Sequence, residues 1–181
     1  NRSGFDEETY FTFSYSPLVD DAGEVVGVLD IATETTSQVV DRRRLSTVDA
    51  LHVALQEHRG STEDLARTVV DLLGGTADVE ACAVYLPSAS GIRLAATSDD
   101  ALLAELPTGL VDKVRTTGRP VVHERTFVAP LEADGETTPG GVLVMSARPR
   151  RPFDASHRQF MMLTTSAVAS AVRASEWQRA Q

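Results

Sequence analysis

The side chains best suited to metal binding or catalysis are few and scattered in this sequence. They are the four histidines His52, His58, His123 and His157 and the single cysteine Cys82. No two histidines have a metal-binding spacing such as HExxH, and no cluster of carboxylates or cysteines accompanies them. No Ser–His–Asp or Cys–His arrangement can be assembled from the pattern. The sequence therefore predicts no metal site and no catalytic residue, and it identifies no cofactor.

Two of these residues have simple structural interpretations. Cys82 lies in the apolar segment ACAVYL, where a free thiol behaves as a small buried hydrophobic group. His123 ends a short strand-like segment, so we interpret it as a polar strand end, with haem ligation as the alternative. The basic run at positions 42–44 is expected to stay mostly in solvent.

Composition and charge exclude several classes of partner. The chain has 181 residues, of which 42% are hydrophobic and 24% charged, values ordinary for a globular protein. Its net charge of −9 argues against nucleic acid and against an anionic membrane surface as partners. Apolar runs are too short to span a bilayer, and the first residues lack a secretory signal. We expect a cytoplasmic protein and, because it starts with Asn1, a fragment or a processed chain.

An aromatic run near the N-terminus predicts the first strand. Phe11, Phe13 and Tyr15 alternate with small hydroxyl residues, which places the three rings on one face. Pro17 is expected to weaken this strand. An acidic turn at 20–23 then leads to a second strand over 24–32, so an antiparallel hairpin is predicted. A two-stranded hairpin cannot bury three aromatic rings by itself, and we expect another part of the protein or a partner to cover them.

A connecting helix over residues 37–58 carries the clearest candidate mechanism. Leu45, Val48, Leu51 and Leu55 are spaced by three and four residues, as in a seam between two helices. Small residues along the C-terminal helix would allow close helix approach. The sequence therefore predicts a homodimer formed through one or both helices. Packing of the connecting helix on its own domain is the alternative.

The remainder of the chain predicts an α+β domain, with an antiparallel sheet between helices, preceded by the hairpin and the connecting helix. Ser61 and Asp64 have the spacing of a capping box at the start of a helix that ends at 74–75. Asp154 is expected to cap a long final helix. The other predicted elements are strands at 81–87, 91–98, 120–123, 127–131 and 141–147, a helical stretch at 99–117 and a turn at 134–136.

Residues 1–45 resemble the C-terminal half of a PAS domain. The resemblance rests on NRSGF, EETYFTFSYSP, DDAGEVVGVL, TETT and RRL, in that order, which look like the last strands and exit helix of PAS domains in bacterial, especially actinobacterial, sensor proteins. It implies a domain division into a PAS half at 1–36, a signalling helix at 37–60 and a second domain at 61–181. A PAS domain also needs N-terminal strands and helices, which we expect to be either missing or not retained here.

Residues 61–177 resemble a GAF domain. STEDLARTVVDLL looks like its entry helix, ACAVYLPSASGIRLAATS like its first hairpin, and GVLVMSARPRRPFDASHRQFMMLTTSAVASAV like its last strand and closing helix. The segment between PVVHER and TFVAPL is shorter than is usual in such domains. The cyclic-nucleotide signature and a chromophore attachment motif around Cys82 are both absent.

The two resemblances imply a non-catalytic sensory module that binds a small ligand or dimerises to control an output domain in the same polypeptide. A histidine kinase of a two-component system is the favoured output. The alternatives are the input region of a metal-dependent serine/threonine phosphatase and a structural dimerisation module without ligand. The implied pocket residues are Phe13, Tyr15, Tyr85 and His123.

Overall fold

The chain begins with a long antiparallel hairpin in the computed structural model, which describes residues 6–131, 140–149 and 152–179. Strand β1 (Phe11–Val19) pairs with β2 (Val25–Glu34), as the alternation predicted. The turn between them is held by Asp20, whose carboxylate accepts the N–H groups of Ala22 and Glu24 at 2.9 Å each. Strand β1 continues through Pro17 because both strands of a two-stranded ribbon are edge strands, where proline is tolerated.

Helix α1 (Thr36–Glu57) follows the hairpin directly and packs on the rest of the chain. Its first turn is joined to the hairpin because the N–H of Tyr10 donates to Thr36 Oγ1 at 2.9 Å, and the N–H of Thr35 donates to the carbonyl of Tyr10 at 2.9 Å. After a short connection, α2 (Thr62–Gly74) starts with the predicted capping box of Ser61 and Asp64. Helix α1 matches the connecting helix predicted over residues 37–58 to within one residue at each end.

Five strands form the sheet of the second domain, in the order β4 (Gly91–Thr97), β3 (Val79–Ser88), β7 (Gly141–Ala147), β6 (Thr126–Leu131) and β5 (Val121–His123). All neighbouring strands are antiparallel. A two-residue turn joins β5 to β6, with Glu124 at a φ of 53°, so the short junction at 125–126 is a closed hairpin. The predicted turn at 134–136 lies outside the described residues.

The central strands of this sheet are buried on both faces. In β3, Cys82 and Val84 pack toward α2 and α5 (Ala155–Arg179), whereas Ala81 and Ala83 pack toward the other side. Alternate residues thus enter two separate apolar clusters, which is why β3 and β7 read as almost continuous apolar runs. The larger cluster also receives Leu51 from α1.

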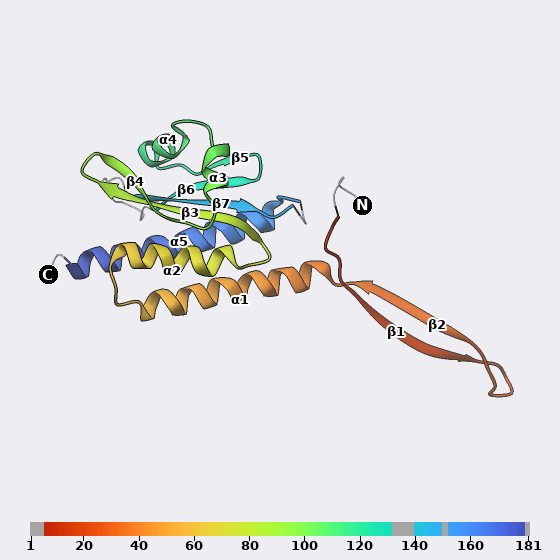
Figure 1. The fold of residues 1–181 in the computed structure, drawn as a ribbon. Coiled ribbons are helices and arrows are strands. Elements are labelled where there is room, and N and C mark those ends of the chain that lie inside the picture. The colour runs from red at the N-terminus through yellow and green to blue at the C-terminus, as the bar shows by residue number, and fades with distance from the viewer. Residues whose placement is uncertain (1–5, 132–139, 150–151, 180–181) are drawn as a thin grey trace.

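Two short helices cover the face of the sheet opposite α2 and α5 (Figure 1). They are α3 (Asp100–Glu105) and α4 (Leu110–Thr117). The predicted helical stretch at 99–117 is thus divided into two helices. Pro107 cannot continue a helix, and Gly109 adopts a left-handed φ of +78° just before α4, so the chain turns between the two helices.

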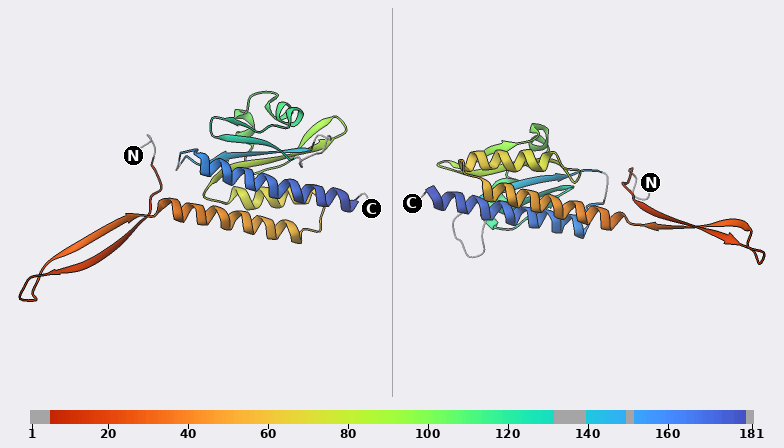
Figure 2. Two further views of the ribbon diagram at one scale, coloured as in Figure 1. Left: turned by 180° about the vertical axis from the view of Figure 1, so that it is seen from behind. Right: turned by 90° about the horizontal axis from the view of Figure 1, so that it is seen from below.

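The layers of the molecule are therefore α3 and α4, the sheet, then α2 and α5, with α1 packed outside them (Figure 2). Helices α1 and α5 lie side by side and run in the same direction, from the end near the hairpin to the end near the C-terminus. The hairpin points away from the sheet domain in every view. This arrangement confirms the predicted α+β fold with a flanked antiparallel sheet and an N-terminal hairpin.

Candidate functional site

A cavity of about 330 Å³ lies between the sheet and the two short helices. Strand β3 contributes Tyr85, α3 contributes Leu103, and α4 contributes Val111. These side chains are only partly buried, so the cavity is in contact with solvent. The complete lining is Tyr85, Ile92, Leu103, Leu106, Pro107, Thr108, Gly109, Val111 and Asp112.

The phenol of Tyr85 is one of the polar side-chain groups in this lining, beside those of Thr108 and Asp112. Burial raises the pKa of Tyr85 above its ordinary value, which keeps the hydroxyl protonated at neutral pH. A neutral phenol can donate one hydrogen bond and accept another. Asp112 adds a carboxylate at the rim, where it pairs with Arg115 at 3.7 Å. The cavity therefore combines apolar walls with polar groups that include the Tyr85 phenol, the Thr108 hydroxyl and the Asp112 carboxylate.

The other predicted pocket residues do not line this cavity. His123 ends β5 at the sheet edge, on the same face as Val121 but outside the lining. Phe13 and Tyr15 lie on the projecting hairpin and are 54% and 66% exposed. Phe13 and Tyr15 therefore line no enclosed pocket among the described residues, because the hairpin extends away from the sheet domain.

The aromatic face of the hairpin is exposed along its whole length. Phe11, Phe13 and Tyr15 lie on one face, with ring centroids 6.3 Å apart for the first pair and 6.5 Å for the second. The opposite face carries Leu29 and Ile31, which are also exposed. No described part of the chain covers either face. Of the covers expected from the sequence, another part of this chain is therefore excluded among the described residues.

The predicted helical seam is divided between an inner and an outer surface. Leu51 and Leu55 belong to the main core of the domain, and Leu51 is only 1% exposed. Their assignment to an exposed dimer seam is therefore wrong, because α1 turns this side toward α2 and α5. Leu45 is 57% exposed and Val48 is partly exposed, so these two remain available at the surface.

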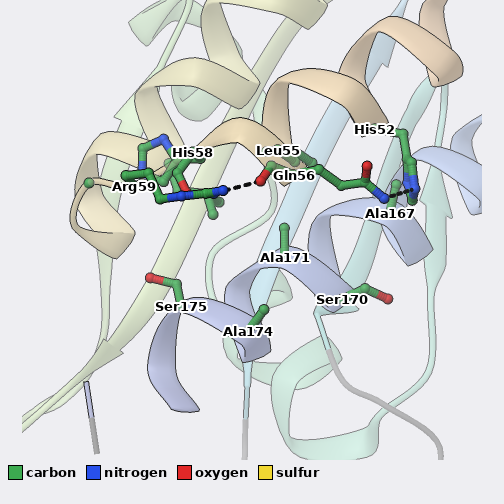
Figure 3. Close-up of a pocket in the computed structure, with 12 residues that line it drawn as sticks. His52, Leu55, Gln56, His58, Arg59, Ala167, Ser170, Ala171, Ala174 and Ser175 are labelled. Carbon is green, nitrogen blue, oxygen red and sulfur yellow. Dashed lines mark hydrogen bonds between the residues drawn. The ribbon is translucent and has the colours of Figure 1, made fainter. Parts of the chain in front are cut away.

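Two hollows follow one another along the line where α1 meets α5. The first, about 290 Å³, is lined by Leu45, Val48 and Leu163 among others. The second, about 320 Å³, has Ala167 and Ala171 of α5 facing His52 and Gln56 of α1 (Figure 3). The His52 Nε2 and Gln56 Nε2 atoms lie 2.7 Å apart along the edge of this hollow. Together the hollows form a groove with an apolar centre and polar edges, which we call the α1–α5 groove.

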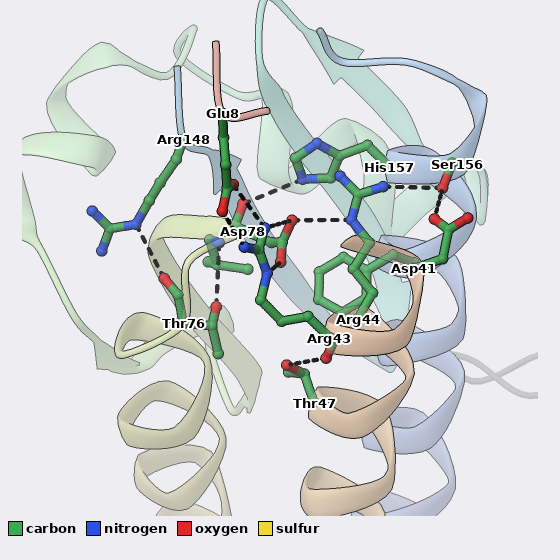
Figure 4. Close-up of polar contacts among 12 residues, drawn as sticks. Glu8, Asp41, Arg43, Arg44, Thr47, Thr76, Asp78, Arg148, Ser156 and His157 are labelled. Carbon is green, nitrogen blue, oxygen red and sulfur yellow. Dashed lines mark hydrogen bonds and ion pairs between the residues drawn. The ribbon is translucent and has the colours of Figure 1, made fainter. Parts of the chain in front are cut away.

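A buried ionic cluster joins the start of α1 to the sheet domain, and sequence reasoning missed it (Figure 4). Asp78, which is buried just before β3, accepts from Arg43 Nε at 2.8 Å and from Arg44 Nε at 3.0 Å. Arg44 is itself buried and lies over the ring of Phe160. The expectation that the 42–44 run stays in solvent is wrong for these two arginines. Burial raises the pKa of Asp78, but the hydrogen bonds and charges of Arg43 and Arg44 together outweigh it and hold this pKa below its ordinary value.

The described residues contain no cluster of three or more His, Cys, Asp or Glu side chains placed to hold a metal ion. Cys82 is a free, buried thiol. Over the same described ranges, no helix has both the length and the apolar character required to cross a lipid bilayer.

Comparison with known families matches the GAF domain over residues 61–172, which is more than half of the chain. Three solved structures share the fold. The GAF domain of the potassium sensor histidine kinase KdpD from Escherichia coli has a TM-score of 0.60 at 18% identity, covering 74% of this chain and 96% of that one. The GAF domain of a phosphoenolpyruvate-protein phosphotransferase from Coxiella burnetii has a TM-score of 0.59 at 15% identity, with 78% and 99% covered.

The third is the GAF domain of a putative sensor histidine kinase from Pseudomonas syringae pv. tomato, with a TM-score of 0.58 at 14% identity, covering 80% of this chain and 94% of that one. The search of curated proteins found no match. GAF domains are sensory and regulatory modules and not catalytic ones. With the helices, sheet order and cavity described above, the family match over residues 61–172 places this chain in the GAF domain family.

Proposed function

We propose that this chain is a cytoplasmic, non-catalytic PAS–GAF sensory module that binds a small ligand and, as a homodimer, controls the output domain of a signalling protein. A histidine kinase is the output we favour, in keeping with two of the similar GAF domains. The observation that carries the ligand-binding role is the cavity of about 330 Å³ beneath α3 and α4. Its size is at the lower end of the range typical of small-molecule sites.

The chemistry of the lining defines the class of ligand. Leu103, Leu106 and Val111 offer apolar walls, and the Tyr85 phenol can donate one hydrogen bond and accept another. A small molecule that carries both an apolar part and hydrogen-bonding groups suits this combination. The Asp112 carboxylate at the rim disfavours an anionic group at the mouth, because like charges would approach there.

The test compares the parent protein with a variant whose cavity is filled. The purified protein is extracted for bound small molecules, its visible spectrum is recorded for haem or flavin, and a metabolite panel is screened by thermal shift. A compound that raises the melting temperature of the parent should leave Leu103→Trp unchanged. The same compound should still raise the melting temperature of the control variant Val122→Trp, in which the tryptophan lies on an exposed edge strand outside the cavity. No bound molecule and no thermal shift with any compound would favour a structural module without ligand.

The α1–α5 groove is the surface we propose for the second copy of the chain. Leu45 and Leu163 are exposed apolar side chains on its two helices, and Ala167 and Ala171 permit close helix approach. Val48 lies between the helices at the first hollow. An association of this kind is isologous, since each copy presents the same pair of helices to the other.

A charge placed in this groove should dissociate the dimer. Sedimentation velocity of the Leu45→Glu/Leu163→Glu variant should give a monomer at concentrations where the parent is dimeric. Val53→Glu is the matched control, because Val53 is 54% exposed on α1 and does not line the groove. A dimer that survives the double substitution would place the interface elsewhere.

Residues 1–36 are proposed to be the C-terminal half of a PAS domain. Exposed apolar side chains on both faces of β1 and β2 support this, since strands with two apolar faces are typical of a sheet covered on both sides. A longer protein carrying the natural upstream sequence should protect the amides of residues 11–34 from hydrogen exchange more strongly than this chain does. Equal protection in the two proteins would contradict the PAS assignment.

A further inference from the structure

The guanidinium group of Arg43 binds two carboxylates, one from the segment before the hairpin and one from the sheet domain (Figure 4). Toward the sheet domain, its Nε and Nη2 atoms donate to the two oxygens of Asp78 at 2.8 and 3.1 Å. Toward the hairpin, its Nη1 and Nη2 atoms donate to the two oxygens of Glu8 at 2.7 and 3.2 Å. One guanidinium group therefore forms a two-point contact with each carboxylate, which is the arrangement that holds orientation best.

The Glu8 side of this bridge is continuous with the hairpin. The hydroxyl of Tyr10 donates to Glu8 Oε1 at 2.5 Å, and the backbone of Tyr10 bonds to Thr35 and Thr36 at the first turn of α1. The entry to β1 is thus fixed on α1 at two points, the helix start and the side chain of Arg43. A movement of the hairpin about the helix start changes the distance between Glu8 and Arg43.

The contact between Arg43 and Asp78 is the permanent half of this bridge, because Asp78 is also bound by a second arginine, the buried Arg44. Arg44 donates to Asp78 Oδ1 at 3.0 Å and to the Ser156 hydroxyl at 3.0 Å, and Ser156 in turn donates to Asp41 at 2.8 Å. Removing Asp78 would leave the buried Arg44 without its carboxylate, and an unpaired buried charge strongly destabilises a fold. The Glu8 contact is different. Both of its side chains are partly exposed, 26% for Arg43 and 20% for Glu8, so water can replace one partner.

We propose that Arg43 is a latch that fixes the direction of the hairpin relative to the GAF domain, with Asp78 as its permanent anchor and Glu8 as its releasable half. When the Glu8 contact opens, the hairpin can swing about the start of α1 while the GAF domain stays intact. The latch would thereby set how the proposed PAS half transmits motion to α1, and in that respect it rests on the proposed function.

The test measures the direction of the hairpin itself. Spin labels are placed at Asp21→Cys on the hairpin turn and Lys113→Cys on α4, in a Cys82→Ala background, and labelled protein is diluted with unlabelled protein to exclude distances between copies. Pulsed electron resonance then gives the distribution of distances. We expect Glu8→Gln and Arg43→Gln to broaden this distribution by about twofold or more, because the hairpin loses its second attachment.

Two controls separate the latch from a general loss of charge. Arg42→Gln removes the neighbouring exposed arginine, and Asp6→Asn removes an exposed carboxylate close to Glu8. Both should reproduce the parent distribution. Glu8→Gln leaves Asp78 paired with both arginines, so the melting temperature of the GAF domain should stay near the parent value. A Glu8→Gln distribution as narrow as that of Asp6→Asn overturns the latch. Because no ligand or dimer enters this measurement, a failure of the proposed function leaves its outcome unaffected.

Discussion

Protonation of His157 should destabilise the folded chain below neutral pH. His157 is fully buried near the start of α5, and its Nε2 lies 3.2 Å from the carbonyl oxygen of Asp78. Nε2 therefore carries the proton that donates to this carbonyl, and Nδ1 has no partner among the described residues. Burial, followed by the nearby charge of Arg44, lowers the pKa of His157 from 6.5 to about 4, against a smaller opposing effect of Asp78.

The sign and size of the effect follow from proton linkage. Below pH 6.5 the unfolded chain binds a proton at this histidine that the folded chain does not bind until about pH 4. The contribution of His157 to the free energy of unfolding is thus complete above pH 7, and it falls as the pH decreases from about 6.5 to about 4. At pH 5 the loss is about 2 kcal/mol, since one pKa unit corresponds to about 1.4 kcal/mol. With a urea dependence of about 2 kcal/mol per M, the unfolding midpoint should decrease by about 1 M between pH 7.5 and pH 5.

The assay compares urea unfolding of the parent, His157→Gln and His52→Gln by far-ultraviolet circular dichroism at several pH values. Glutamine at position 157 keeps a hydrogen-bond donor but cannot titrate, so this variant should lose about 2 kcal/mol less than the parent between pH 7.5 and pH 5. His52 is exposed and serves as the control, which should follow the parent. If His157→Gln and the parent lose equal stability over this range, the assignment of a neutral, buried imidazole is refuted.

Three further predictions test the core. Gly141→Ala should reduce the free energy of unfolding by at least about 2 kcal/mol in calorimetry, because its Cβ would collide with the backbone oxygen of Tyr85 on the paired strand. Burial raises the pKa of the Cys82 thiol to about 11, so a disulfide reagent at pH 8 should react with it only after unfolding in urea. Leu51→Ala should reduce the unfolding free energy by about 2–5 kcal/mol and Val53→Ala, at an exposed position outside the α1–α5 groove, by less than about 0.5 kcal/mol, as measured by urea titration.

Local features of the fold could be predicted from sequence because they depend on neighbouring residues. The period of two in the aromatic run identified β1, and the spacing of Ser61 and Asp64 identified the start of α2. The division of the 99–117 stretch also has a local signal, because Pro107 and Gly109 interrupt it, although the apolar spacing on either side is typical of one helix.

Features that depend on distant residues were not predictable in the same way. Arg43 and Arg44 form a basic run like any solvated helix face until Asp78, some 35 positions away, is brought beside them. Leu51 and Leu55 show the same limit, since a spacing of three and four residues is equally compatible with packing inside one chain and between two. Tyr85 was identified only through the family resemblance, and the cavity beside it is formed by α3 and α4.

The position of α1 restricts how a signal can pass through this molecule. Val40, Leu51 and Leu55 are buried against the domain, and removing each of them from the core would cost about 1.5–3 kcal/mol. Sliding α1 alone would therefore require roughly 5–9 kcal/mol. A ligand shifts an equilibrium only by its difference in affinity between two states, and allosteric couplings are typically about 1–3 kcal/mol. In the proposed homodimer, α1 and α5 would then move as one unit against the partner copy, with the exposed Leu45 and Leu163 at the moving surface.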